Sequence, residues 1–166
     1  GLSFDDYDAT TEITGIDICA PMLEKARVKL ATGRYPYVKD VLLMDAHKLA
    51  FEDATFDCVV AQFVITLVEN PEAVLSECRR VVKPGGRIIL VNHLYSETGL
   101  SAAFERWAAK HARKIGLRPE FPFARLSAWA EASGDATLIE RRKISPFYTL
   151  VSFARIGGDR ENVQAA

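Results

Sequence analysis

Residues 56–93 read FDCVVAQFVITLVENPEAVLSECRRVVKPGGRIILVNH, and this stretch decides the fold. Its first part, Phe56–Gln62, is a short apolar run of the kind that forms a strand buried on both faces of a sheet. Asn70 and Pro71 then predict the start of a helix. Asn caps the free amides of a first turn, and Pro lacks an amide hydrogen that this turn would leave unpaired.

The segment after Pro71 has the periodicity of an amphipathic helix. Its apolar residues form one stripe, made of Val74, Leu75, Cys78, Val81 and Val82. Pro84-Gly85-Gly86 predicts the end of this helix, and Arg87–Asn92 predicts a second buried strand. A strand, a crossover helix and a strand of these lengths form a right-handed parallel unit. Ligands of such sheets bind beyond the carboxyl ends of the strands, here at Gln62–Thr66 and Asn92–Ser96.

Two more strands are expected before this unit, and an aspartate lies at the end of each. They are Ile13–Asp17 and Val41–Met44, the second followed by Asp45. Between them, a helix is predicted from Pro21 near its start to Gly33 past its end, and a loop at Arg34–Lys39.

The last part of the chain predicts a loop, a short helix and a hairpin. The expected loop is Glu120–Arg125, and Ser127 is expected to cap a helix that ends at Gly134. Thr137–Ile144 and Phe147–Ile156 predict an antiparallel hairpin that completes the sheet.

Composition narrows the class of protein. The chain has 166 residues, 49% of them hydrophobic and 26% charged, as in an ordinary globular domain. Its net charge of −1 argues against nucleic acid as a partner. The apolar stretches are too short to span a membrane, and an acidic, polar start indicates no signal peptide, so we expect a cytoplasmic protein. The three cysteines, which lack metal-ligand spacing, are expected to be buried small hydrophobes, and no metal site is expected.

The motifs at these strand ends, taken in order, resemble those of class I S-adenosylmethionine (SAM)-dependent methyltransferases. The matching pieces are Gly15-Ile16-Asp17, Met22–Ala26, Asp45-Ala46-His47, Phe56-Asp57 and Val82–Gly86. The resemblance covers residues 1–156 and implies a Rossmann-like α/β sheet with an antiparallel final hairpin, and SAM as cofactor. The family's first strand has no counterpart here, and only the end of its glycine-rich turn is matched, by Gly1-Leu2-Ser3. We therefore expect an N-terminally incomplete methyltransferase domain at 1–156, lacking the usual first strand, and a flexible tail at 157–166.

Three stretches are most similar to bacterial phosphatidylethanolamine N-methyltransferases: Val91-Asn92-His93, Tyr95–Glu105 and Pro146–Val151. This similarity implies N-methylation of phosphatidylethanolamine toward phosphatidylcholine, and a phospholipid or other amphiphilic acceptor as partner. Two alternatives stay open. One is a C- or O-methyltransferase of a quinone-type acceptor, and the other is a truncated, non-catalytic remnant of the fold.

The resemblance implies that two aspartates bind opposite parts of the cofactor's adenosine. Asp17 can accept both ribose hydroxyls, although an aspartate there can also cap the next helix. Asp45 can accept from the adenine amine while a backbone amide of Ala46 or His47 donates to the ring; a local turn is the alternative. The expected cofactor-binding residues are Gly1, Asp17, Ile18, Asp45, Ala46, His47, Gln62 and Phe63.

Transfer to an amine needs alignment, exclusion of water and a neutral acceptor. His93 is the candidate base because an imidazole titrates near neutral pH, although a structural histidine is the alternative. Aromatic faces hold methylated ammonium groups by cation–π attraction, although strand aromatics usually pack in the core. The candidates for such a pocket are Tyr148, Tyr95, Phe147 and Tyr35. We name His93, Tyr148 and Tyr95 as the candidate catalytic residues.

Residues 98–116 predict a helix with one apolar and one basic face. The basic residues on and just after it are Arg106, Lys110, Arg113, Lys114 and Arg118. Such a helix suits an anionic membrane surface, where each basic residue adds about 1 kcal/mol. A helix packed on the sheet with a solvated basic face is the alternative. The first interpretation predicts peripheral binding to the inner membrane face.

Overall fold

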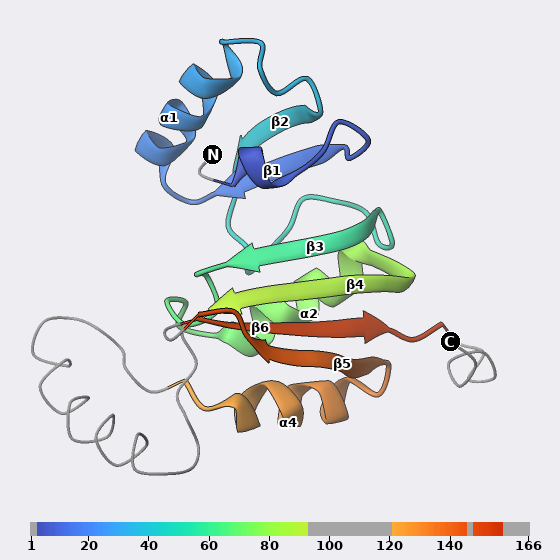
Figure 1. The fold of residues 1–166 in the computed structure, drawn as a ribbon. Helices are drawn as coiled ribbons and strands as arrows, with labels where there is room; N and C mark the ends of the chain where they lie inside the picture. The colour runs from blue at the N-terminus through green and yellow to red at the C-terminus, as the bar shows by residue number, and fades with distance from the viewer. Residues whose placement is uncertain (1–2, 93–120, 146–147, 158–166) are drawn as a thin grey trace, which may run out of the picture. The chain divides into compact units, whose positions relative to one another are not determined.

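The first fifty residues form a small unit in which one helix packs beside two parallel strands. A computed structural model describes residues 3–92, 121–145 and 148–157, and it divides the chain into units at 1–50 and 51–166 (Figure 1). In the first unit, β1 (Ile13–Asp17) pairs in parallel with β2 (Val38–Leu43), and α1 (Ala20–Leu30) connects them. A short 3-10 turn, η1 (Phe4–Asp6), precedes β1. The predicted β1 is confirmed, whereas β2 begins and ends earlier than expected.

An aromatic and aliphatic cluster holds this first unit together. Its buried members are Phe4, Leu23, Ala26, Tyr35, Val38 and Val41. The ring of Tyr35 lies 5.5 Å from that of Phe4, and its hydroxyl donates to Asp5 Oδ1 at 2.9 Å. Tyr35 is therefore a core residue, and our suggestion that it lines an ammonium pocket is wrong.

The second unit contains the predicted strand–helix–strand unit and the hairpin in one sheet. Its strands are β3 (Phe56–Gln62), β4 (Val82–Asn92), β5 (Ala136–Lys143) and β6 (Thr149–Arg155). The strand order is β3-β4-β6-β5, with β3 and β4 parallel and the other two pairs antiparallel. The parallel unit and the closing hairpin are confirmed, and the fold is the mixed α/β architecture expected from the resemblance.

Helix α2 (Pro71–Val81) begins where the sequence predicts, since the Asn70 side chain accepts from the Ala73 amide at 3.1 Å. The helix ends at Val81, earlier than expected, and β4 already begins at Val82. The register between β3 and β4 is irregular here: Phe56 lies opposite Val82, and Cys58 lies opposite Arg87. Pro84-Gly85-Gly86 therefore forms an irregular part of β4 instead of a separate helix stop.

Two helices pack on one face of this sheet and against each other. Helix α4 (Phe123–Ser133) contacts α2 through Trp129, whose indole N–H donates to Ser76 Oγ at 3.2 Å. The same indole packs edge-on against buried Phe153 of β6. Arg125 adds a bidentate ion pair with Glu72, with both N–O distances 2.7 Å. Figure 1 shows both helices beside the sheet.

Helix α4 corrects two predictions. It begins at Phe123, so the expected loop at 120–125 is helical over its last residues, and Ser127 lies inside the helix instead of capping it. Pro122 precedes the first turn, where a missing amide hydrogen costs no hydrogen bond. The end of the helix is as expected, with Gly134 in the left-handed conformation at φ 74°.

Strand β3 is less buried than its apolar sequence predicts. Asp57 and Cys58 are exposed, because β3 is an edge strand in the sheet order of the described residues. Cys19 is exposed as well, and of the three cysteines only Cys78 is buried. The expectation that all three are buried is wrong for Cys19 and Cys58. Within the described residues, no helix is both long and apolar enough to cross a membrane.

Candidate functional site

In the first unit, the two predicted adenosine-binding aspartates lie at the carboxyl ends of neighbouring strands. Asp17 ends β1 and lies opposite Leu43, the last residue of β2. The backbone N–H of Met44 then donates to the carbonyl oxygen of Asp17 at 3.1 Å. Asp45 is the next residue after Met44. The parallel pairing therefore brings both carboxylates to the carboxyl end of one small sheet, as a cofactor site requires.

The Asp17 carboxylate is partly engaged by its own chain. Its Oδ1 accepts from the backbone N–H of Cys19 at 2.8 Å, which forms a local turn before α1. Among the described residues, Oδ2 receives no hydrogen bond, so it can accept from a ligand hydroxyl. The N-cap of α1 is Cys19, so Asp17 does not cap this helix as the alternative proposed; it forms a turn before the helix and keeps a free acceptor.

Asp45 is fixed by the residue two positions later. Its Oδ1 accepts from the His47 backbone N–H at 2.9 Å and contacts His47 Nδ1 at 2.7 Å. The backbone bond first, and then the ring contact, lower the pKa of this exposed carboxyl. Because the His47 amide is already used, the amide of Ala46 is the better candidate donor to an adenine nitrogen.

The residues around these carboxylates fit an adenosine group. Beside Asp17, the Ile18 side chain is 70% exposed, and such an apolar surface is suited to cover a ring. The Met44 side chain contacts the loop that follows it, since its sulfur accepts a hydrogen bond from the Ala50 amide at 3.4 Å. Two carboxylates, an available amide and an exposed apolar side chain are therefore present at one sheet edge.

In the second unit, two predicted site residues from distant parts of the chain touch. Phe63, directly after β3, and Tyr148, directly before β6, have ring centroids 4.9 Å apart and planes at 61°. Both rings are exposed, Phe63 at 46% and Tyr148 at 40%. Gln62 is half-buried at the end of β3 and lies opposite Val91. This edge of the sheet is where ligands of parallel strands bind.

Asn92, which begins the stretch expected to bind ligands but is not among the named site residues, carries an unpaired acceptor at the same end of the sheet. Its side chain is 2% exposed, and Oδ1 accepts no hydrogen bond from the described residues. Asn92 lies opposite Thr149, the residue after Tyr148. The sequence signal for Asn92 is its amide side chain at the carboxyl end of a predicted parallel strand.

Several predicted site residues lie outside the described residues. They are Gly1, His93 and Tyr95, together with Phe147 and the expected basic helix at 98–116. Their roles stay predictions. Within the described residues, no group of His, Cys, Asp and Glu side chains has the arrangement of a metal site.

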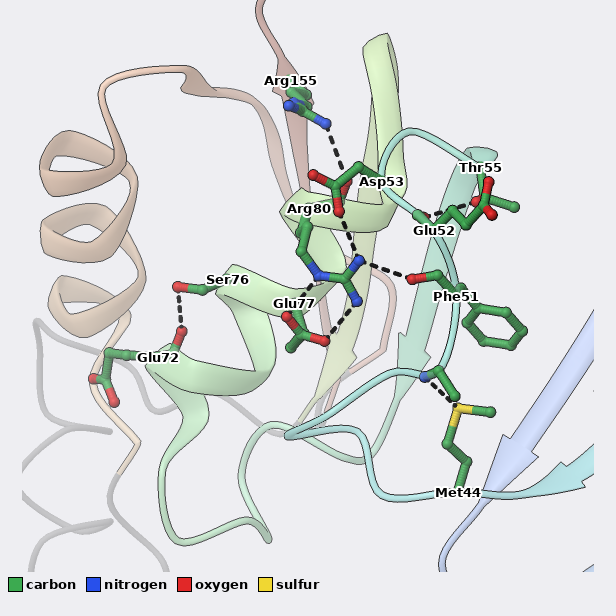
Figure 2. Close-up of polar contacts among 11 residues, drawn as sticks. Met44, Phe51, Glu52, Asp53, Thr55, Glu72, Ser76, Glu77, Arg80 and Arg155 are labelled. Carbon is green, nitrogen blue, oxygen red and sulfur yellow. Dashed lines mark hydrogen bonds and ion pairs between the residues drawn. The ribbon is translucent and has the colours of Figure 1, made fainter.

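A guanidinium cluster near the start of the second unit has a structural role. Figure 2 shows Arg80 of α2 bonded to Glu77, to Asp53 and to the carbonyl oxygen of Phe51. The Glu77 bonds are bidentate at 2.8 Å, and together with Asp53 they raise the pKa of Arg80. All of its partners are supplied by the protein, so the cluster fixes the loop before β3.

Comparison with known proteins agrees with this geometry. Residues 2–90 match the family described as methyltransferase domain. The chain belongs to the methyltransferase domain family. Across 157 residues, this methyltransferase is 36% identical to a phosphatidylethanolamine N-methyltransferase from Cereibacter sphaeroides, a match that covers 93% of this chain and 75% of the relative.

The methyltransferase is also similar to a second sequence relative and to a solved structure. It is 37% identical over 87 residues to a demethylmenaquinone methyltransferase from Thermotoga maritima, covering 52% of this chain and 35% of that one. A solved SAM-dependent methyltransferase from Methanosarcina mazei has the same fold, with a TM-score of 0.66 and 18% identity, covering 93% of this chain and 85% of that one. The protein is an enzyme of this class, and S-adenosyl-L-methionine is its methyl donor.

Proposed function

We propose that this methyltransferase transfers methyl groups to the amino group of phosphatidylethanolamine. One observation carries the proposal: the similarity to a phosphatidylethanolamine N-methyltransferase extends over 93% of the chain. It therefore includes residues beyond 90, the part after the family match, where β6 and Tyr148 lie. The match to the demethylmenaquinone methyltransferase covers only about half of the chain.

Methyl transfer from SAM requires binding and alignment of the two substrates more than it requires reactive side chains. SAM, when bound, supplies a methyl group that is already activated on a sulfonium. Asp17 and Asp45 are suited to hold its ribose hydroxyls and adenine amine through their free carboxylate oxygens. His93, as the proposed base, would keep the acceptor amine neutral.

The acceptor is a membrane lipid, so the enzyme must reach a bilayer surface. We propose that the basic residues of 98–116 and Arg118 bind anionic lipid there. Sedimentation with vesicles tests this. Binding that rises with the fraction of anionic lipid supports the proposal, and equally weak binding to anionic and zwitterionic vesicles contradicts it.

Labelled methyl transfer tests the substrate. The enzyme is incubated with methyl-labelled SAM and vesicles that contain either phosphatidylethanolamine or demethylmenaquinone. Label in the phospholipid alone supports the proposal, whereas label in the quinone alone identifies the other acceptor class. Titration calorimetry with SAM is run in parallel, because a folded sample without cofactor binding identifies a non-catalytic chain.

A further inference from the structure

Phe63 occupies a backbone conformation that bulky side chains rarely adopt. Its φ is 59°, in the left-handed region that is unfavourable for residues other than glycine. The backbone N–H of Phe63 donates to the carbonyl oxygen of Val91 at 2.8 Å, which anchors this turn to β4. Strained residues that a fold retains are concentrated at ligand-binding sites. The position of the ring is thus fixed at a cost in free energy.

Hydrogen bonds of both its N–H and its carbonyl oxygen fix the backbone of Tyr148. Its backbone N–H donates to Ser145 Oγ at 3.0 Å. Its carbonyl oxygen accepts from the N–H groups of Ile144 and Ser145, at 3.0 and 3.3 Å. These three bonds hold the backbone of Tyr148 in place directly before β6.

The two rings meet but are not buried. Two other aromatic rings of the second unit, those of half-buried Phe123 and buried Phe121, already have a cation of the protein beside them. The guanidinium carbon of Arg141 lies 4.0 Å from the centre of the Phe123 ring, and that of Arg125 lies 5.2 Å from the centre of the Phe121 ring. Among the described residues, no Lys or Arg lies over Phe63 or Tyr148. With 46% and 40% of their surfaces exposed, the two side chains offer aromatic surface that a ligand cation can contact.

We propose that Phe63 and Tyr148 form a subsite for the methylated ammonium group of the acceptor, so that partly methylated headgroups are retained for further transfer. This inference rests on the proposed function and names the substrate chemistry of that site. Each added methyl group makes the ammonium larger and less strongly hydrated, so it leaves water more easily. Exposed aromatic surface then attracts it more strongly than a primary ammonium.

Binding of soluble headgroups to the full chain, without SAM, tests the subsite directly. The probes are phosphocholine, phosphoethanolamine and 3,3-dimethylbutyl phosphate, in which a neutral tert-butyl group replaces the trimethylammonium. We expect phosphocholine to bind about tenfold more tightly than the other two, as cation–π contacts of ordinary strength would give. Equal affinity for the charged and neutral probes would overturn the proposal.

Variants assign the effect to the two rings. Tyr148→Leu and Phe63→Leu should each remove most of the preference for phosphocholine, whereas Tyr148→Phe, which keeps a ring, should retain it. Phe51→Leu is the matched control, because Phe51 forms another edge-to-face pair, with Phe56, also at 4.9 Å. A preference that survives in both folded leucine variants would overturn the assignment. If those variants fail to fold, the comparison of the three probes on the unaltered chain decides alone.

A methyl-transfer assay with three acceptor lipids tests the subsite and the proposed function separately. The acceptors are vesicles of phosphatidylethanolamine and of its N-monomethyl and N,N-dimethyl forms. We expect Tyr148→Leu to lower kcat/KM severalfold more for the dimethyl lipid than for phosphatidylethanolamine. Equal losses for all three acceptors would overturn the subsite while leaving the proposed function intact. No transfer by the unaltered enzyme to any of them would overturn the proposed function.

Discussion

A methyl group added to Gly86 would lie 2.6 Å from the carbonyl oxygen of Asp57. The backbones of β3 and the irregular part of β4 therefore approach more closely than any side chain permits. Lys83 Nζ also donates to Asp57 Oδ1 at 2.8 Å, across the same irregular pairing. Two short motifs that are separate in the sequence, Phe56-Asp57 and Val82–Gly86, form one structural feature.

This contact predicts a large effect of a small substitution. Gly86→Ala should lower the free energy of unfolding by about 2–3 kcal/mol, because backbone atoms must move to accept the new methyl group. Gly157→Ala is the control, since its Cβ would meet Pro84 at an ordinary 3.7 Å. Urea unfolding followed by circular dichroism measures both. A Gly86→Ala protein as stable as the control would contradict the close approach.

Asp45 should titrate at unusually low pH. Hydrogen bonds from the His47 backbone and ring favour the ionised carboxylate, so the folded pKa lies below the ordinary 3.8. The resulting stability is present above the unfolded-state pKa and is lost as the pH falls through the folded one. Carboxyl-detected NMR should show this low midpoint. In His47→Ala the midpoint should rise but stay below the ordinary value, because the backbone bond remains. An ordinary midpoint in the unaltered protein would contradict the contacts.

The cysteines should differ sharply in reactivity. Burial raises the pKa of the Cys78 thiol from 9.0 to about 12, which lowers its thiolate fraction about a thousandfold. Cys19 is exposed. With N-ethylmaleimide at pH 8, we expect peptide mass spectrometry to find Cys19 modified in the native protein and Cys78 modified only after unfolding in urea. Rapid native labelling of Cys78 would contradict its burial in α2.

Ser152 offers a stabilising substitution. Its hydroxyl is buried and has no hydrogen-bond partner among the described residues. Ser152→Ala should therefore raise the free energy of unfolding by about 1 kcal/mol, because an unpaired polar group no longer has to be desolvated. Ser133→Ala is the contrast. The Ser133 hydroxyl donates to the Ala130 carbonyl at 2.7 Å and accepts from the Ala136 amide at 3.2 Å, so that variant should be less stable. A destabilised Ser152→Ala protein would show that this hydroxyl is hydrogen-bonded in the folded state and contradict the prediction.

Local signals were sufficient where a few neighbouring residues decide the conformation. The cap at Asn70, the strand Phe56–Gln62 and the turn at Gly134 are all as predicted. Predictions failed where contacts distant in sequence decide the outcome. The start of α4 at Phe123, the exposure of Cys58 and the burial of Tyr35 all depend on neighbours that a local pattern does not reveal.

In the candidate site too, some features follow from local sequence and others from contacts between distant residues. The sequence by itself determined the alternation of strands and helices, the aspartates at the ends of β1 and β2, and the resemblance to SAM-dependent methyltransferases. These features depend on local periodicity and the order of motifs. Only the tertiary structure decided that Phe63 touches Tyr148, since the two are separated by 84 residues in the sequence. The end of β3 and the start of β6 come to one end of the sheet because β4 pairs with both strands. The tertiary structure also decided which polar groups lack partners, as at Asn92, because hydrogen-bond satisfaction depends on all the neighbours of a group.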